Sequence, residues 1–226
     1  MPVVVFASAK GGCGKTTCAV ILGSELAQRG ASVTIIDADP NRNVADWAKL
    51  PGAPAGLNVV GEVTEETIVD AIEDASQRST FVIADLEGSA SLLVSYAVAM
   101  ADLVLVPCQG SQMDARQAGR MVKLIGTQSR ISGREIPFAL VLTRTSPTIV
   151  GRTQRHIEGR FGEMALPVLV ARLHDREAFR SLFSYGGTLA GLSDKAVSNL
   201  PAAQENARQF VAEIVERLRG PKQEVA

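Results

Sequence analysis

Short runs of consecutive apolar residues recur along the chain and predict buried β-strands. The runs are five or six residues long, and few alternate with polar positions, which is typical of parallel strands covered on both faces. The predicted strands are Val3–Ala7, Ser32–Asp37, Phe81–Asp85, Leu103–Pro107, Phe138–Thr143 and Leu166–Val170.

Segments with a helical spacing of apolar positions lie between these runs. They are Lys15–Arg29, Thr64–Gln77, Ser89–Met100, Asp114–Gln128, Gly151–Arg160, Asp175–Phe183 and Pro201–Arg219. The alternation predicts an α/β fold with a doubly wound, mostly parallel sheet flanked by helices. No repeat or linker-like segment divides the 226 residues, so we expect a single domain over residues 1–226.

The composition is 46% hydrophobic and 21% charged, which excludes a disordered or collagen-like chain. The longest uncharged stretch, Gly88 to Ala101, is too short to span a bilayer as a helix. No basic residue precedes the apolar N-terminal run, so it does not match a signal peptide and we expect a cytoplasmic protein. Three cysteines without metal-like spacing favour neither a disulfide framework nor a zinc site.

A glycine-rich segment follows the first predicted strand. Residues 8–17 are Ser-Ala-Lys-Gly-Gly-Cys-Gly-Lys-Thr-Thr, and a helix is predicted to begin within them. Glycines let backbone N–H groups turn toward phosphate oxygens, and the N-terminus of the helix adds its dipole. Lys15 is placed to reach the β- and γ-phosphates, and the Thr16 hydroxyl is placed to bind Mg²⁺. Ala9 replaces the first glycine of the ordinary P-loop pattern, and a second lysine, Lys10, precedes the glycines.

Acidic residues end two of the predicted strands. Asp37 and Asp39 follow one apolar strand, and a proline comes directly after them. Asp85 ends another strand of four apolar residues, which is the Walker B pattern, and such an aspartate usually holds Mg²⁺ through water.

The chain resembles the deviant-Walker P-loop ATPases of the ParA/MinD family, and in particular the small ParA-type partition ATPases that lack an N-terminal DNA-reading domain. The resemblance rests on the K-G-G-x-G-K-T loop, on the D-x-D-P segment at Asp37 and on the strand that ends at Asp85. It implies a P-loop NTPase fold with ATP and Mg²⁺ as cofactors. The residues it implies for nucleotide binding are Lys10, Gly11, Gly12, Cys13, Gly14, Lys15, Thr16 and Thr17.

The resemblance also implies roles in a slow, partner-stimulated hydrolysis of ATP. Lys10, Lys15 and Asp39 are the implied catalytic residues. Lys10 reaches the nucleotide of the partner subunit in a homodimer, and Asp39 positions the attacking water. Thr16, Asp37 and Asp85 are the implied metal residues, the two aspartates through water.

Two segments depart from the family pattern. Leu86-Glu87-Gly88-Ser89 occupies a position where partition ATPases often have a proline-containing segment. Thr143 and Arg144 end the strand on which the family often places an adenine-reading asparagine. The sequence contains no N-K-x-D motif for guanine, which favours ATP over GTP.

Charge is divided unevenly along the chain. Residues 1–110 carry 6 Lys and Arg against 13 Asp and Glu, whereas residues 111–226 carry 17 against 11. A basic half suits a polyanion, and the resemblance implies double-stranded DNA bound by the ATP-state dimer without sequence preference. The candidate DNA-binding residues are Arg152, Arg155, Arg176, Arg180, Lys195 and Arg208. We expect a cytoplasmic protein that associates with the nucleoid when ATP is bound.

The favoured function is that of a ParA-type ATPase that segregates a plasmid or chromosome, or positions a cargo, with a ParB-like or other protein stimulating hydrolysis. One alternative is a conjugation-associated, ParA-like ATPase that assembles a DNA-processing complex for DNA transfer. A MinD-like, membrane-associated positioning ATPase and a non-hydrolysing scaffold are further alternatives. The last helix places Phe210, Ile214 and Leu218 on one face and Glu213 and Glu216 among its polar residues, which favours docking on the sheet over membrane binding.

Overall fold

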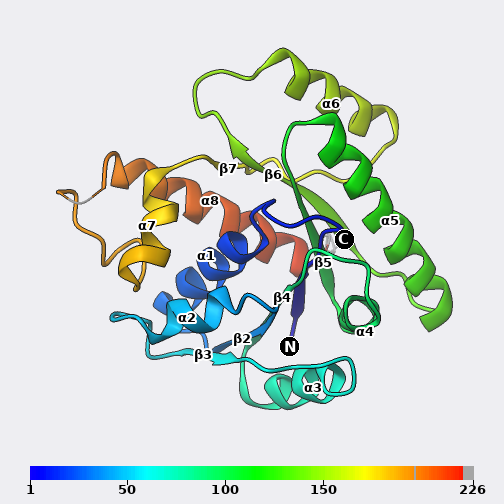
Figure 1. Ribbon diagram of the computed structural model, residues 1–226, viewed down its shortest axis with the longest axis horizontal. Coiled ribbons are helices and arrows are strands. Elements are labelled where there is room, and N and C mark those ends of the chain that lie inside the picture. The colour runs from blue at the N-terminus through cyan, green and yellow to red at the C-terminus, as the bar shows by residue number, and fades with distance from the viewer. Residues whose placement is uncertain (196, 221–226) are drawn as a thin grey trace, which may run out of the picture.

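The computed structural model describes residues 1–195 and 197–220, and residues 221–226 of the predicted domain lie outside the described residues. Seven strands in the described part form a sheet in the order β3-β2-β4-β1-β5-β6-β7, with parallel pairing throughout (Figure 1). They are β1 (Val3–Phe6), β2 (Val33–Ala38), β3 (Leu57–Val60), β4 (Phe81–Leu86), β5 (Leu103–Cys108), β6 (Phe138–Thr145) and β7 (Leu173–His174). The predicted α/β class and parallel sheet are confirmed.

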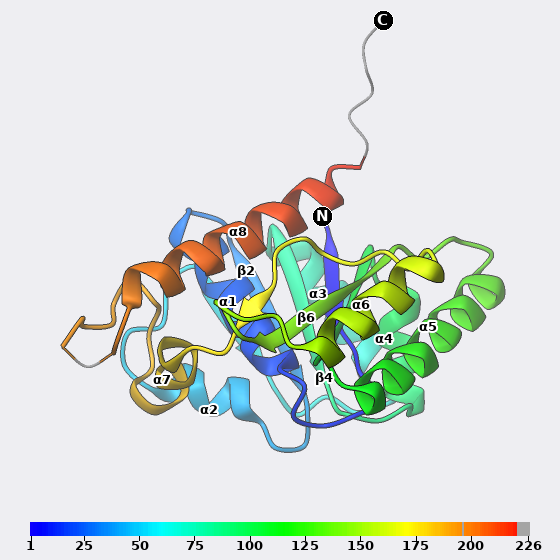
Figure 2. The ribbon, with the colours of Figure 1, turned by 90° about the horizontal axis from the view of Figure 1, so that it is seen from above.

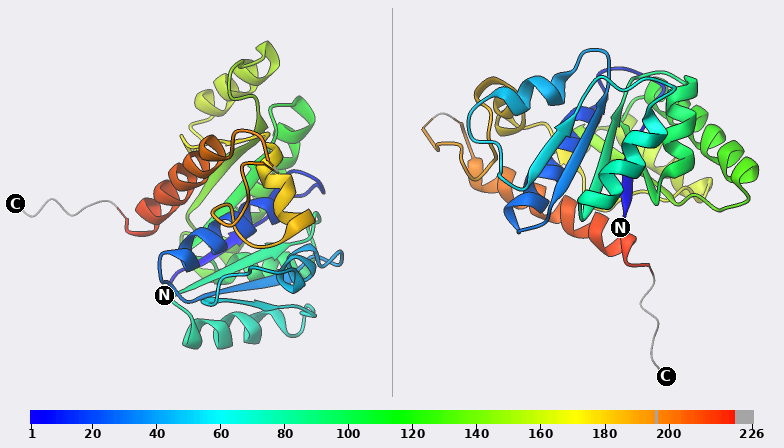
Figure 3. Two further views of the ribbon diagram at one scale, coloured as in Figure 1. Left: turned by 90° about the vertical axis from the view of Figure 1, so that its left-hand side faces the viewer. Right: turned by 90° about the horizontal axis from the view of Figure 1, so that it is seen from below.

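Helices cover both faces of the sheet (Figure 3). They are α1 (Lys15–Gln28), α2 (Asn43–Lys49), α3 (Ile68–Arg78), α4 (Leu92–Met100), α5 (Gln112–Ser132), α6 (Arg152–Glu163), α7 (Glu177–Tyr185) and α8 (Leu200–Leu218). Helices α1, α2, α7 and α8 pack on one face, and α3, α4, α5 and α6 pack on the other. None of the helices in the described ranges is long and apolar enough to cross a membrane.

The central strand β1 is apolar at every position because helices cover both of its faces. Val4 and Phe6 face the core that contains α1 and α8, whereas Val3 and Val5 face the core that contains α3 and α4. Successive side chains of a strand point to opposite faces, so a strand covered on both sides needs an apolar residue at each position.

The last helix, α8, packs along the sheet face that α1 also covers (Figure 2). Phe210, Val211 and Ile214 are almost fully buried there. The prediction that the apolar side of this helix docks on the sheet is therefore confirmed.

The predicted strand Leu166–Val170 is wrong. Val168 makes only an isolated bridge to Leu140, and the strand that pairs with the end of β6 is the two-residue β7. Pro167 has no N–H to donate to a ladder. The Leu169 N–H still donates to the Leu140 carbonyl of β6 at 2.9 Å, but pairing stops there. The N–H groups of Val170 and Ala171 donate instead to the two carboxylate oxygens of Glu213 on α8, at 3.0 and 2.7 Å.

Two elements between β2 and β4 were not predicted. Helix α2 has only seven residues, and its Ala45 N–H donates to the carboxylate of Asp37, which lies eight positions earlier. Strand β3 has four residues, all partly or fully exposed, and lies at the edge of the sheet. Both elements are too short for a periodic signal, and each depends on β2 for its position.

Candidate nucleotide-binding site

The loop between β1 and α1 turns through two glycines with left-handed backbone geometry. Gly12 has φ of 76° and Gly14 has φ of 98°, a conformation that favours glycine. Gly14 is the N-cap of α1, and the first turn of α1 contains neither a capping side chain nor an acid. The first N–H groups of the helix are therefore open to an anionic ligand, as a phosphate site requires.

The two lysines of the loop have different surroundings. Lys15 begins α1, is buried, and forms no ion pair within the described residues. Lys10 is partly exposed, and its Nζ lies 3.0 Å from Oδ1 of Asp114 in the first turn of α5. The Asp114 side chain is buried and also accepts a hydrogen bond from Ser111. Lys15 is thus available to a ligand at the helix N-terminus, whereas Lys10 is held within its own chain.

Asp37 and Asp85 lie side by side on neighbouring strands, because β2 and β4 pair in a register that matches these residues. Asp85 is fully buried, and neither of its carboxylate oxygens has a hydrogen-bond partner among the described residues. Burial raises the pKa of Asp85 from 3.8 to about 7, while the nearby Thr16 hydroxyl and the Lys15 charge oppose the rise. An unpartnered buried carboxylate near a threonine hydroxyl is a donor set that fits Mg²⁺.

The other two carboxylates of this edge are already engaged. Asp37 accepts the N–H of Ala45 at 2.8 Å and that of Asp39 at 3.3 Å, so it holds the start of α2. Burial raises the pKa of Asp37, and the hydrogen bonds from Ala45 and Asp39 oppose the rise. Asp39 is partly exposed and accepts hydrogen bonds from the backbone and side chain of Asn41, at 2.9 and 2.8 Å. Asp37 and Asp39 line one cavity together with Glu87, and Asp85 lies beside Asp37 on the neighbouring strand.

Residues at the ends of β4, β5 and β6, or just beyond them, brace the phosphate loop, and sequence reasoning missed them. Gln109 Nε2 donates to the carbonyl of Gly12 at 3.1 Å, and Thr143 Oγ1 donates to the carbonyl of Cys13 at 2.7 Å. Gly88 packs so closely that a Cβ on it would lie 2.5 Å from the backbone nitrogen of Gly11. These residues, like the acids, lie at the ends of strands, and that position was the signal in the sequence that could have identified them.

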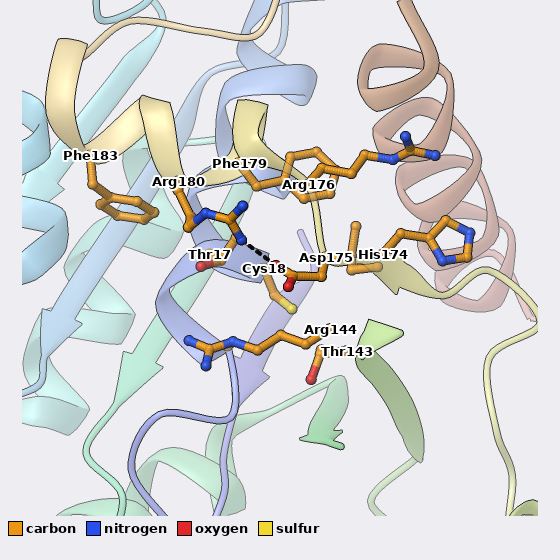
Figure 4. Close-up of a pocket in the computed structure, with 12 residues that line it drawn as sticks. Thr17, Cys18, Thr143, Arg144, His174, Asp175, Arg176, Phe179, Arg180 and Phe183 are labelled. Carbon is orange, nitrogen blue, oxygen red and sulfur yellow. Dashed lines mark hydrogen bonds and ion pairs between the residues drawn. The ribbon is translucent and has the colours of Figure 1, made fainter. Parts of the chain in front are cut away.

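A cavity of about 390 Å³ opens beside the start of α1 (Figure 4). Residues of α1, β6, β7 and α7 line it, among them Thr17, Thr143, Arg144, Asp175, Phe179 and Phe183. Its volume is in the range of small-ligand pockets, and its lining combines aromatic rings with polar groups. It therefore has the size and chemistry for the base and sugar of a nucleotide.

Ion pairs and backbone geometry shape the entrance of this cavity. Arg180 pairs with Asp175 and, at 2.8 Å, with Glu177, and Figure 4 shows the Arg180 and Asp175 side chains pointing toward one another. Arg144 has φ of 51°, a left-handed conformation that is uncommon for a residue with a side chain. The pKa of His174 is lowered by burial and by the charge of Arg176.

The candidate DNA-binding residues are dispersed rather than gathered. Arg152 and Arg155 are exposed on α6, and Lys195 is exposed in the segment before α8. Two other candidates, Arg176 and Arg180, line the cavity beside α1, and Arg180 is ion-paired there. The remaining candidate, Arg208 on α8, pairs with Glu205 at 2.9 Å.

Comparisons with known proteins place this geometry in context. The family model described as VirC1 protein matches residues 1–219. The chain is 39% identical over 218 residues to Protein ParA of Rhizobium radiobacter, covering 96% of this chain and 98% of that protein. It is 25% identical to maintenance of carboxysome distribution protein A of Halothiobacillus neapolitanus, over 92% of this chain and 94% of that one. A solved structure of Cyanothece McdA in complex with ATP has a TM-score of 0.77 at 18% identity, covering 100% and 99% of the two chains.

Proposed function

This chain belongs to the VirC1 family, and from that membership and the geometry of the phosphate loop we propose that it is a Mg²⁺-dependent ATPase of the ParA type. ATP drives formation of a homodimer that binds duplex DNA without sequence preference. Hydrolysis, stimulated by a ParB-like or other partner protein, releases the DNA. The cycle segregates a plasmid or chromosome or positions another cargo.

The observation that carries this proposal is the convergence of three groups at one edge of the sheet. They are the uncapped N-terminus of α1, the buried Lys15 and the unpartnered carboxylate of Asp85. A free helix N-terminus and a lysine bind phosphate oxygens, and an orphaned carboxylate beside a threonine hydroxyl binds a hydrated divalent cation.

The proposed reaction assigns each residue a separate task. Lys15 and the N–H groups of the loop bind the β- and γ-phosphates, while Thr16 and Asp85 hold Mg²⁺ with support from Asp37. When bound, Mg²⁺ neutralises negative charge that develops on the transferred phosphoryl group. Asp39 orients the attacking water. Because phosphoryl transfer needs mainly positioning and charge stabilisation, these fixed groups supply what the step requires.

Lys10 links hydrolysis to dimerisation in this proposal. In the dimer it leaves Asp114 and reaches the nucleotide of the partner subunit, where its charge acts as an arginine finger would. Gly11, Gly12, Cys13, Gly14 and Thr17 complete the phosphate site through the loop backbone and the first turn of α1.

The cavity beside α1 takes the adenosine in this proposal. Thr143 does not read the base, since its hydroxyl donates to the loop carbonyl of Cys13. Phe179 offers an aromatic surface, and Arg144 and Asp175 offer polar contacts.

The test measures binding to random-sequence duplex DNA with ATP, with ADP and without nucleotide, at two salt concentrations, together with ATP turnover. We expect DNA binding that depends on ATP, weakens as the salt concentration rises and shows no sequence preference. Asp39→Ala is expected to bind ATP but lose turnover, and turnover equal to wild type would remove Asp39 from the mechanism. A preference for one duplex sequence would instead support assembly of a DNA-transfer complex. ATP-dependent co-sedimentation with anionic liposomes would support a membrane-associated role.

A further inference from the structure

The solvent-facing side of α5 carries cations and no free anion. Arg116, Arg120, Lys123 and Arg130 are exposed, whereas the one acid of this helix, Asp114, is buried and ion-paired. Arg116 and Arg120 are four residues apart, so their like charges repel on one helix face. A stripe of this kind is destabilising for the free helix and favours an anionic partner.

Helix α6 lies beside α5 and extends the cationic surface (Figures 1 and 2). Arg152, Arg155 and Arg160 are exposed on it. Of the two acids of α6, Glu158 is ion-paired at 2.9 Å with an arginine outside the two helices, and Glu163 is exposed at the last residue of the helix. Arg160 and the α5 residue Arg116 line the same groove, so the two sets of cations meet.

Elsewhere on the described surface, most cations are paired with acids. The paired cations are Lys10, Arg29, Arg42, Lys49, Arg78, Arg172, Arg180, Arg208 and Arg217. Among the described residues, no ion pair involves the exposed cations of α5 or α6. The exposed positive charge that no acid neutralises is therefore concentrated on α5 and α6.

We propose that the α5–α6 face, formed by Arg116, Arg120, Lys123 and Arg130 of α5 and by Arg152, Arg155 and Arg160 of α6, binds the phosphate backbone of duplex DNA. This inference rests on the proposed function and assigns its DNA surface mainly to residues other than those expected from the sequence. The distance from Arg116 to Arg130 along α5 is about 21 Å at the helical rise per residue. That length matches about six base steps of duplex, enough for several phosphate contacts.

An acidic peptide is the other anionic partner to consider. Ile157, Phe161 and Met164 line the groove between α5 and α6, which would suit apolar side chains of such a peptide. The cations, however, continue beyond the groove to Lys123 on α5 and to Arg152 on α6. A long stripe of arginines fits a regular row of phosphates better than it fits a short groove-bound segment.

The position of α5 also connects this surface to the nucleotide site. The first turn of α5 contains Asp114, which holds Lys10, and the segment before α5 contains Gln109, which braces the loop at Gly12. A nucleotide that draws Lys10 away therefore changes the contacts at the start of the helix that carries the cations. This arrangement couples the proposed DNA surface to the proposed ATP site.

The test compares two triple variants of the full chain that lose the same charge. The first is Arg116→Gln, Arg120→Gln and Lys123→Gln on α5. The matched control is Arg29→Gln, Lys49→Gln and Arg78→Gln, three exposed cations that are each paired with an acid three or four residues earlier in the chain. Both are first checked for cooperative thermal unfolding. If the α5 triple does not fold, the double variant Arg152→Gln and Arg155→Gln on α6 replaces it.

Affinity for a random-sequence duplex with ATP is then measured over a range of salt concentrations. The α5 triple is expected to bind at least tenfold more weakly, with the salt slope reduced by about 2.7 if each cation contacts one phosphate. The control is expected to stay within about threefold of wild type because its cations are already neutralised. Equal binding by the two triples would overturn the α5–α6 assignment and leave the proposed function intact. Wild-type protein that binds no DNA would overturn both, and tighter binding of polyglutamate than of duplex would assign the face to a peptide.

Discussion

Lys10 Nζ lies 3.0 Å from Asp114 Oδ1, so the lysine proposed to act on the nucleotide of the partner subunit is paired within its own chain. The two residues are 104 positions apart, and the Asp114 side chain is buried while that of Lys10 is 38% exposed. The pair therefore competes with dimerisation for the same ammonium group.

Replacing Asp114 tests this competition. Asp114→Asn keeps the shape of the side chain but removes its charge, so Lys10 is released more easily. We expect the ATP-dependent dimer to tighten about fivefold, which corresponds to about 1 kcal/mol for a partly exposed pair. Sedimentation velocity with ATP measures the change, and Asp46→Asn, an exposed acid paired with Lys49, is the control. An unchanged dimer constant would show that the pair does not restrain Lys10.

The two loop lysines should separate ATP binding from dimerisation. Lys15→Ala removes the buried charge at the start of α1 and should weaken ATP binding by about 2–4 kcal/mol, roughly 30- to 1000-fold. Lys10→Ala should keep ATP affinity within about threefold of wild type but lose the ATP-state dimer. Titration with a fluorescent ATP analogue and light scattering measure the two effects. A Lys10→Ala protein that dimerises like wild type would rule out the role of Lys10 in the partner's site.

Gly88 should be intolerant of any side chain. A Cβ there would lie 2.5 Å from the Gly11 nitrogen and 2.6 Å from the Lys10 carbonyl carbon, so Gly88→Ala must displace the phosphate loop. We expect ATP affinity to fall at least tenfold while the protein remains folded. Gly126→Ala on α5 is the control, since its Cβ meets nothing within 4 Å and should stabilise the helix by about 1 kcal/mol. Normal ATP binding by Gly88→Ala would show that the loop can move aside at little cost.

Asp85 should make the stability of the chain depend on pH. Burial raises its pKa to about 7 in the native state, so the native carboxyl binds more proton than the unfolded one between about pH 4 and 7. The stability contributed by the protonated form is therefore lost as the pH rises through this window. Asp85→Asn removes the titrating group and should stabilise the metal-free protein at pH 8 by a few kcal/mol.

Urea unfolding at several pH values between 5 and 8.5 measures this dependence. Glu66→Gln, an exposed carboxyl before α3, is the control and should follow wild type. If Asp85→Asn shows the same pH dependence as wild type, the group responsible lies elsewhere.

The segments that directly follow α2 and α7 pack so closely that one added methyl group should lower the stability of the chain. A Cβ on Gly186 would lie 2.4 Å from the Leu50 Cβ and 2.7 Å from the Pro51 carbonyl oxygen, and Gly186 has φ of 78°. Gly186→Ala should therefore destabilise the chain by about 2–4 kcal/mol through strain and overpacking. Fluorescence reports the unfolding, because Trp47 is the only tryptophan and donates its Nε1–H to the Gly187 carbonyl.

Gly133→Ala provides the matched control for this change. Gly133 has φ of 65° and ψ of 15° and open space around its Cβ position, so it measures the cost of a side chain in the ordinary left-handed region. Gly186 has ψ of −167°, a conformation that is almost confined to glycine, so its larger cost includes both backbone strain and close contacts. We expect it to cost only about 1 kcal/mol. Equal destabilisation by the two variants would show that packing against Leu50 adds nothing.

Local sequence patterns were enough to predict the central strands and most helices. The elements that could not be predicted depend on contacts with distant residues. The apolar run Val3–Phe6 is visible because β1 is covered on both faces. The segment around Val168 is equally apolar, yet the N–H groups of Val170 and Ala171 bond to Glu213, which is more than 40 positions away. Helix α2 is likewise supported by Asp37 rather than by a periodic pattern of its own.

The sequence by itself determined the glycine-rich loop proposed to bind phosphate and the acids that lie at the same edge of the sheet. The glycines, Lys15 and the start of α1 are contiguous, so their geometry follows from neighbouring residues, and Asp37 and Asp85 both end strands of one parallel sheet. Only the tertiary structure decided that Asp114 holds Lys10, and that Asp85 and the exposed cations of α5 and α6 have no partner among the residues that the structure describes. Burial and ion pairing depend on contacts between residues that are far apart in the chain, and local sequence spacing does not indicate which of these residues are in contact.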